Sequence, residues 1–128
     1  MEVKDKNIDP AVKENQEADL QVIKLHSDSD IEQLAGTVGG KRNLREVVVT
    51  TDDGYQFIYL VKKPNRSVMQ TIAEYEQKKD IAAIEKLMVG LVLLGDKDAY
   101  DHDGAIYTVL LTEIGRLVQT AKGEAKKL

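Results

Sequence analysis

Residues 44–61 read LREVVVTTDDGYQFIYLV, and this segment carries the clearest β-structure signal of the chain. Its two ends, Leu44–Thr50 and Tyr55–Val61, are rich in the β-branched and aromatic residues that favour strands. Between them, residues 52–54 (DDG) are turn formers, and Gly54 accepts the positive φ that a tight hairpin needs. The segment therefore predicts a β-hairpin.

The second predicted strand has apolar side chains on both faces. Alternation places one set on the same face: Tyr55, Phe57, Tyr59 and Val61. Ile58 and Leu60 lie on the other face. Because an isolated hairpin is marginally stable in water, a third strand, the helices or another chain must cover it. Leu20–His26 (LQVIKLH), with four aliphatic residues in seven, is the candidate third strand.

The first 43 residues are predicted to form an acidic N-terminal arm, separate from a domain of residues 44–128. Residues 1–19 carry too few apolar side chains to offset the entropy of ordering them, which predicts a flexible arm. Ser29 and Glu32 have capping-box spacing, which predicts a short helix over Ile31–Ala35. The glycines that follow are expected to form a linker: Gly36, Gly39 and Gly40.

Three helices are predicted after the hairpin. Pro64 ends the strand and suits the first turn of a helix that runs from Arg66 to about Lys79. Asp80 is the expected cap of a second helix, Ile81–Leu94, which Gly95 would end. A long last helix is expected from about Ala105 to Lys122 or beyond. The inner stripe of the first helix is predicted to be Val68, Met69, Ile72, Ala73 and Tyr75. The predicted class is α+β: a hairpin, three-stranded if the N-terminal strand joins it, followed by a three-helix bundle.

The chain offers more apolar faces than a monomer of this size easily covers. Leu87–Leu94 (LMVGLVLL) is apolar nearly all round, so it must lie centrally in the core or be covered by another subunit. The five Tyr and one Phe are either a binding platform or, as we expect, core-edge residues with buried rings and solvated hydroxyls. The excess apolar surface predicts a protein partner and a homo-oligomer.

Composition excludes several function classes. The chain has 128 residues, a formal net charge of −4, no Cys and two His. Thiolate chemistry and Cys-based zinc sites are therefore excluded, and His26 and His102 are too far apart in sequence to form a histidine cluster. No basic face suits nucleic acid, and no apolar run suits a membrane. We predict a cytoplasmic protein without a catalytic centre, cofactor or metal.

Two local motifs have ordinary explanations. Gly36–Arg42 (GTVGGKR) lacks the spacing of a phosphate-binding loop. The acidic loop Asp96–Gly104 lacks the ligands of a calcium loop, so we expect Asp101 or Asp103 to cap the last helix. His102 is then a solvated loop residue, because no nucleophile or second carboxylate pair is positioned to complete a mechanism.

The order of elements carries a family resemblance. The hairpin runs into Lys62-Lys63-Pro64-Asn65-Arg66, the helix pair ends at Leu94-Gly95-Asp96, an Asp-rich loop follows, and the last helix closes on Lys126-Lys127-Leu128. In this order, residues 47–128 resemble the small tail-assembly chaperone proteins encoded by tailed phages and prophages.

The resemblance implies a non-enzymatic assembly factor in the host cytoplasm that coats the helical tape-measure protein while the tail tube polymerises. Such capture places a client helix in an apolar groove. Helical periodicity predicts that groove around Leu87, Leu91, Ile114, Leu117 and Val118, all of which are core residues if the protein is monomeric. The alternative is a virion structural component, such as a capsid or connector accessory protein.

Overall fold

The α+β class is confirmed by the structure, a computed structural model that describes residues 20–128. Strands and helices follow one another as β2 (Gln21–Lys24), α2 (Asp28–Ala35), η1 (Lys41–Asn43), β3 (Leu44–Thr50), β4 (Tyr55–Lys62), α3 (Arg66–Gln77), α4 (Ile81–Val89), β5 (Val92–Leu94), α5 (Lys97–His102), α6 (Gly104–Arg116) and η2 (Leu117–Gln119). The flexible arm predicted over residues 1–19 lies outside the described residues.

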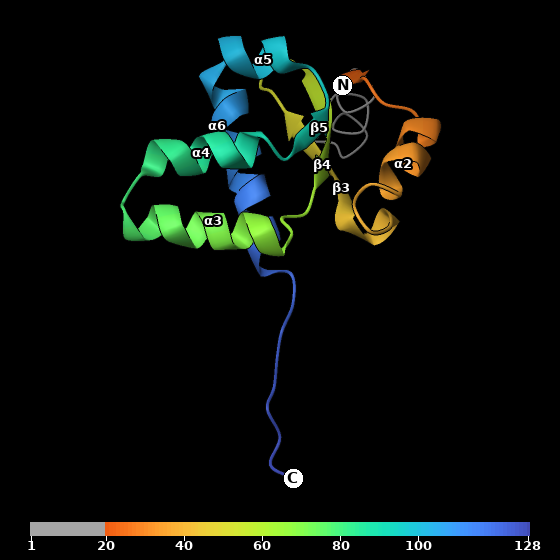
Figure 1. The fold of residues 1–128 in the computed structure, drawn as a ribbon. Coiled ribbons are helices and arrows are strands. Elements are labelled where there is room, and N and C mark those ends of the chain that lie inside the picture. The colour runs from red at the N-terminus through yellow and green to blue at the C-terminus, as the bar shows by residue number, and fades with distance from the viewer. Residues whose placement is uncertain (1–19) are drawn as a thin grey trace, which may run out of the picture.

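The sheet is built around the predicted hairpin. β3 and β4 pair antiparallel from Leu44 opposite Lys62 to Thr50 opposite Gln56, and Gly54 in the turn has φ of 93°. On its other edge β4 pairs with two strands in succession, parallel with β2 through Tyr55–Ile58 and antiparallel with β5 at Leu60 and Val61. β4 is therefore the centre of a four-stranded mixed sheet (Figure 1).

The predicted N-terminal strand and the helix after it both form, with one correction. Leu20–His26 contains β2, which belongs to the same sheet as the hairpin although it precedes residue 44. The capping box of α2 uses Ser27 and Asp30, not Ser29 and Glu32. Ser27 Oγ accepts from the Asp30 amide at 3.1 Å, and the Asp30 carboxylate accepts from the Ser27 amide at 2.8 Å. The helix begins at Asp28, so Ser29 lies inside its first turn.

The second predicted helix is shorter than expected. α4 ends at Val89 with Gly90 as its C-cap, and the rest of the apolar run crosses into β5. Leu94 pairs with Leu60 and Val92 pairs with Val61. The predicted helix over Ile81–Leu94 was wrong in its last turn, because a continuous apolar run has no period that separates a buried helix from a buried strand.

The segment after β5 also differs from the prediction. The expected acidic loop contains a helix, α5, whose N-cap is Asp96, while Asp103 caps α6 as one of the two predicted candidates. α6 ends at Arg116 instead of continuing to Lys122, and one 3-10 turn follows. Every residue of Thr120–Leu128 is exposed, so no packing supports further helix there.

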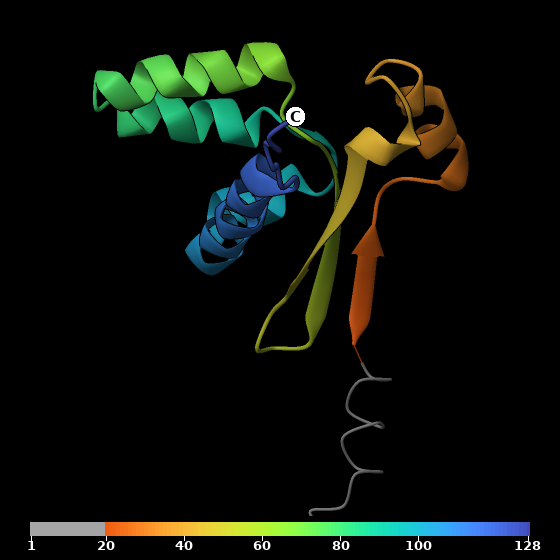
Figure 2. The same ribbon diagram turned by 90° about the horizontal axis from the view of Figure 1, so that it is seen from below.

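The main core lies between one face of the sheet and the helices. Figure 2 shows α3, α4 and α6 on this face and α2 on the opposite side of the sheet. The core side chains come from β3, β4 and β5, from α5 and α6, and from Leu91: Val47, Val49, Phe57, Tyr59, Val61, Leu91, Val92, Tyr100, Ile106, Leu110 and Ile114. Leu44 and Leu60 are also buried, at strand positions that alternate with the core-facing ones.

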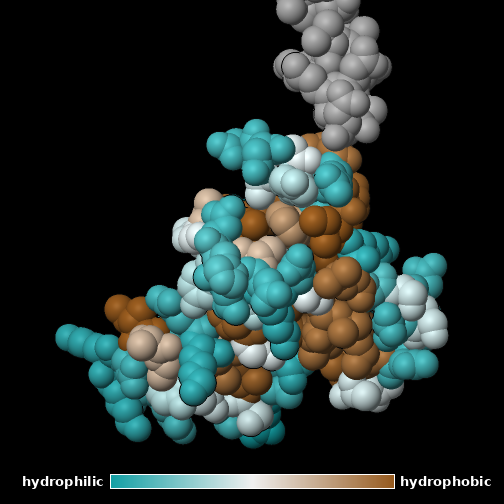
Figure 3. All heavy atoms as spheres, turned by 90° about the horizontal axis from the view of Figure 1, so that it is seen from above, coloured by the Kyte–Doolittle hydropathy of each residue, from teal (hydrophilic) through white to brown (hydrophobic). Residues whose placement is uncertain are grey.

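Apolar residues nevertheless remain on the surface. Figure 3 shows hydrophobic side chains gathered in patches on the face that it presents. Val22 is 54% exposed and Leu25 is 56% exposed, and both lie in or beside β2. Within residues 20–128 no helix combines the length and the hydropathy that a membrane span requires.

Candidate functional site

An apolar concave site lies between α3 and α4, which form an antiparallel helix pair (Figures 1 and 2). Asn65 caps α3 by accepting from the Val68 amide at 2.9 Å, and Asp80 caps α4 by accepting from the Ala83 amide at 3.1 Å. Lys79 joins the two helices with φ of 56°, in the left-handed region. These local signals fix the two walls of the pocket.

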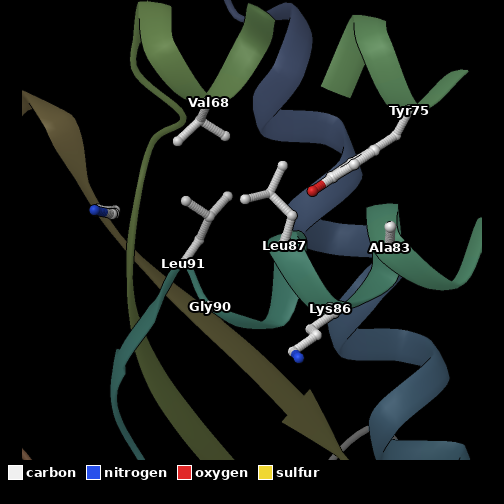
Figure 4. A pocket seen from close by; sticks show the side chains of 8 residues that line it. Val68, Tyr75, Ala83, Lys86, Leu87, Gly90 and Leu91 are labelled. Carbon is white, nitrogen blue, oxygen red and sulfur yellow. The ribbon is translucent and has the colours of Figure 1, made fainter. Parts of the chain in front are cut away.

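The pocket has a volume of about 430 Å³, within the range of roughly 300–1,000 Å³ typical of ligand sites. Val68 of α3 and Leu87 and Leu91 at the α4 end point toward one another in Figure 4. Tyr75 extends from α3 with its hydroxyl toward Leu87, and Gly90 contributes no side chain. The site is therefore an apolar depression with one aromatic wall.

The charged side chains that line the pocket are both lysines. Lys62 comes from the end of β4 and Lys86 from α4. In Figure 4 Lys86 points away from Val68 and Leu91. Neither lysine makes a salt bridge to the residues that the structure describes. An apolar partner surface with flanking acidic residues would match this pattern.

The structure does not bring the five predicted groove residues together. Leu91 and Ile114 are core residues, with 2% and 0% of their surface exposed. Leu87 lines the pocket, whereas Leu117 packs against the core. Val118 lines a separate depression near the end of α6. Of the predicted set, Leu87 and Leu91 thus share one site, and the contribution of Leu91 is limited by its burial.

Part of the pocket was not predicted from the sequence, and one residue of α3 was placed wrongly. Val68 and Tyr75 were expected on the inner stripe of α3, and they line the pocket from that stripe. Ala73, predicted on the same stripe, is exposed. Lys62 and Ala83 carried no signal in the sequence, because each joins the site only when the end of β4 and the start of α4 pack beside α3.

The acidic segment provides helix caps. The Asp96 carboxylate accepts from the Ala99 amide at 3.1 Å, and the Asp103 carboxylate accepts from the Ala105 amide at 3.0 Å. His102 is exposed, with Nδ1 2.9 Å from the Asp98 carbonyl oxygen. Across residues 20–128 no three His, Asp or Glu side chains are arranged to hold a metal ion.

A buried histidine bonded to a half-exposed glutamate is a polar feature that the sequence did not indicate. His26 follows β2, and its Nε2 lies 2.6 Å from a carboxylate oxygen of Glu46 in β3. Lys24 lies 3.4 Å from the same oxygen. The hydrogen bond from His26 is the main cause that lowers the pKa of Glu46 below its ordinary value. This pair fastens the segment after β2 to β3, the strand on the other side of β4.

Three tyrosines form a chain of rings through the core. The ring centroids are 5.9 Å apart for Tyr59 and Tyr100 and 6.2 Å apart for Tyr100 and Tyr107. The Tyr59 hydroxyl donates to the Asp96 carbonyl at 2.7 Å, and burial raises the pKa of this hydroxyl. The prediction of a solvated hydroxyl is therefore wrong for Tyr59, whose hydroxyl donates a hydrogen bond to the backbone within the fold.

Comparison with protein-family models, with curated proteins and with solved structures finds no match to this chain.

Proposed function

We propose that this protein is a non-enzymatic assembly factor, of the phage or prophage tail-assembly chaperone type, that holds a client helix in the pocket between α3 and α4. The observation that carries the proposal is the apolar depression formed by Val68, Tyr75, Leu87 and Leu91. An amphipathic helix binds such a depression through one or two apolar side chains. The clients we propose are the tape-measure protein or other tail proteins.

The charge around the pocket favours a particular kind of client helix. Lys62 and Lys86 flank the apolar surface, so acidic residues beside the apolar stripe of the client gain favourable contacts. A helix with basic residues beside that stripe is disfavoured for the same reason. The site is open and only partly apolar, which suits reversible binding better than permanent association.

The test is affinity capture from cells that produce the phage particles, with mass-spectrometric identification of captured proteins. The informative variant is Ala83→Glu, which adds a bulky carboxylate to the pocket lining. The matched control is Ala73→Glu, the same change at an exposed position of α3. We expect the parent and the control to recover the tape-measure protein and Ala83→Glu to recover much less.

The other possible outcomes of the capture experiment also distinguish between the proposed roles. Equal recovery with both variants would show that the client binds elsewhere. Recovery of capsid or connector proteins, together with retention in mature particles, would support the virion-component alternative. Recovery of no virion protein by the parent would exclude both roles. Thermal melts of the variants establish that the comparison is made between folded proteins.

A further inference from the structure

A second pocket lies on the neighbouring side of α4, where that helix faces α5 and α6. Its volume is about 370 Å³. Glu85 and Val89 line it from α4, Tyr100 and Asp101 from α5, and Tyr107 from α6. Lys86 lines both pockets, so α4 separates an apolar site flanked by lysines from this aromatic and acidic one.

The carboxylates of this pocket have no cationic partner among residues 20–128. Neither Glu85 nor Asp101 takes part in a salt bridge there. Glu85 accepts a hydrogen bond from the Tyr107 hydroxyl at 3.2 Å, which uses one of its two oxygens. Asp101 belongs to a segment with three further aspartates, Asp96, Asp98 and Asp103, and one lysine, Lys97. The two carboxylates of the pocket lining also outnumber its one lysine, Lys86, so the local charge is negative and attracts a cation.

The aromatic walls are held in place by the fold. Tyr100 is 8% exposed and belongs to the core, and Tyr107 packs against the same core. Their ring planes are tilted by 48° at a centroid separation of 6.2 Å. Burial is the main cause that raises the pKa of Tyr107, and the hydrogen bond to Glu85 and the nearby negative charges raise it further. The site therefore combines fixed π surfaces with carboxylate groups.

We infer that this pocket binds an arginine side chain of a partner protein. A guanidinium group is flat, stacks on a tyrosine ring and donates in a fork that matches a carboxylate, whereas an ammonium group cannot do both. The arginine site is a different pocket from the α3–α4 pocket, so the proposed function and this inference can each fail without the other. If both hold, the arginine comes from a part of the partner other than the apolar stripe that the α3–α4 pocket holds.

The inference can be tested by titrating the ¹⁵N-labelled full chain with the capped tripeptide acetyl-Ala-Arg-Ala-amide and following amide chemical shifts. We expect saturable shifts confined to α4, α5 and the start of α6, with a dissociation constant in the millimolar range. The same tripeptide with citrulline, which is neutral but similar in shape, should bind at least several-fold more weakly. Equal binding of the two peptides, or shifts centred elsewhere, would overturn the inference.

Matched variants identify the groups responsible. Glu85→Gln and Asp101→Asn should each weaken binding of the arginine peptide by about 3- to 5-fold, the size expected for a partly exposed ion pair. Glu74→Gln, the same charge change at an exposed position of α3, should leave the affinity unchanged. Unaltered binding in both pocket variants would refute the assignment. Tighter binding of free arginine than of the capped peptide would also refute it, because the site would then be one for the free amino acid.

Discussion

Gly95 lies directly against the ring of Tyr59. A Cβ atom placed on Gly95 would come within 2.2 Å of Tyr59 Cδ1, and the φ of Gly95 is 149°. The same tyrosine reaches past Gly95 to bond the carbonyl of Asp96. The turn from β5 into α5 is thus shaped around one buried ring, and a residue with a side chain does not fit at position 95.

Gly95→Ala is therefore expected to destabilise the fold by about 2–4 kcal/mol, because the added methyl group collides with a buried ring and the backbone angle is unfavourable for alanine. Urea unfolding followed by circular dichroism measures the change. Gly123→Ala, at a position with no heavy atom within 4 Å of the built Cβ, should leave the free energy of unfolding nearly unchanged. Equal stability of the two variants would contradict the packing described for Tyr59.

Lys79 is a residue with a side chain at a backbone position that favours glycine. Its φ of 56° is the one positive value at a non-glycine position in the described chain. Lys79→Gly should stabilise the protein by up to about 1 kcal/mol by relieving the left-handed conformation. Lys78→Gly, at the C-cap with φ of −82°, gains no such relief and should not stabilise. Denaturant midpoints of the two variants distinguish the outcomes, and a destabilised Lys79→Gly would place the strain elsewhere.

Ile114 tests the placement of α6. Its side chain is fully buried in the core, so Ile114→Asp should destabilise the fold by about 3–5 kcal/mol through an unpaired buried carboxylate. Val109→Asp is the control on the same helix, because Val109 is 43% exposed. We expect thermal melting to show a large loss for the first variant and a small one for the second. Similar melting of Ile114→Asp and the parent would rule out this packing.

Glu46 should contribute to stability in a pH-dependent way. Its pKa in the folded protein lies below the ordinary value of 4.5, first because of the hydrogen bond from His26 and also because of Lys24. The ionised carboxylate is thus favoured by folding, so its contribution is present above the ordinary pKa and is lost as the pH falls through the lowered pKa. The side chain is 40% exposed, which limits the contribution to about 1 kcal/mol or less.

Glu46→Gln isolates this contribution. We expect the variant to be less stable than the parent at pH 6 and the difference to shrink as the pH is lowered below about 4.5. Urea unfolding at a series of pH values, with exposed Glu32→Gln as the control, measures it. A difference that stays constant or grows on acidification would show that Glu46 acts without ionisation.

The sequence predicted the elements whose signals are local. Residues 44–61 predict both strands and the turn between them, because strand-forming residues flank a glycine that the turn requires. Pro64 and Asp80 mark the starts of α3 and α4 to within two residues. The proline ring and the capping carboxylate act on the nearest turn of the backbone, so their effect can be predicted from the sequence. The α+β class followed from the order of these elements.

Other features depend on neighbours that are distant in the sequence, and these became visible in the folded protein alone. Val92–Leu94 is a strand because the free edge of β4 offers it hydrogen bonds, which no local pattern records. The pocket joins Lys62, Tyr75 and Leu87 from three elements. The residues predicted to form one groove do not lie together, because Ile114 fills the core and does not face the pocket. A sequence fixes local preference, but which apolar face is buried and which is left open depends on how the elements pack against one another.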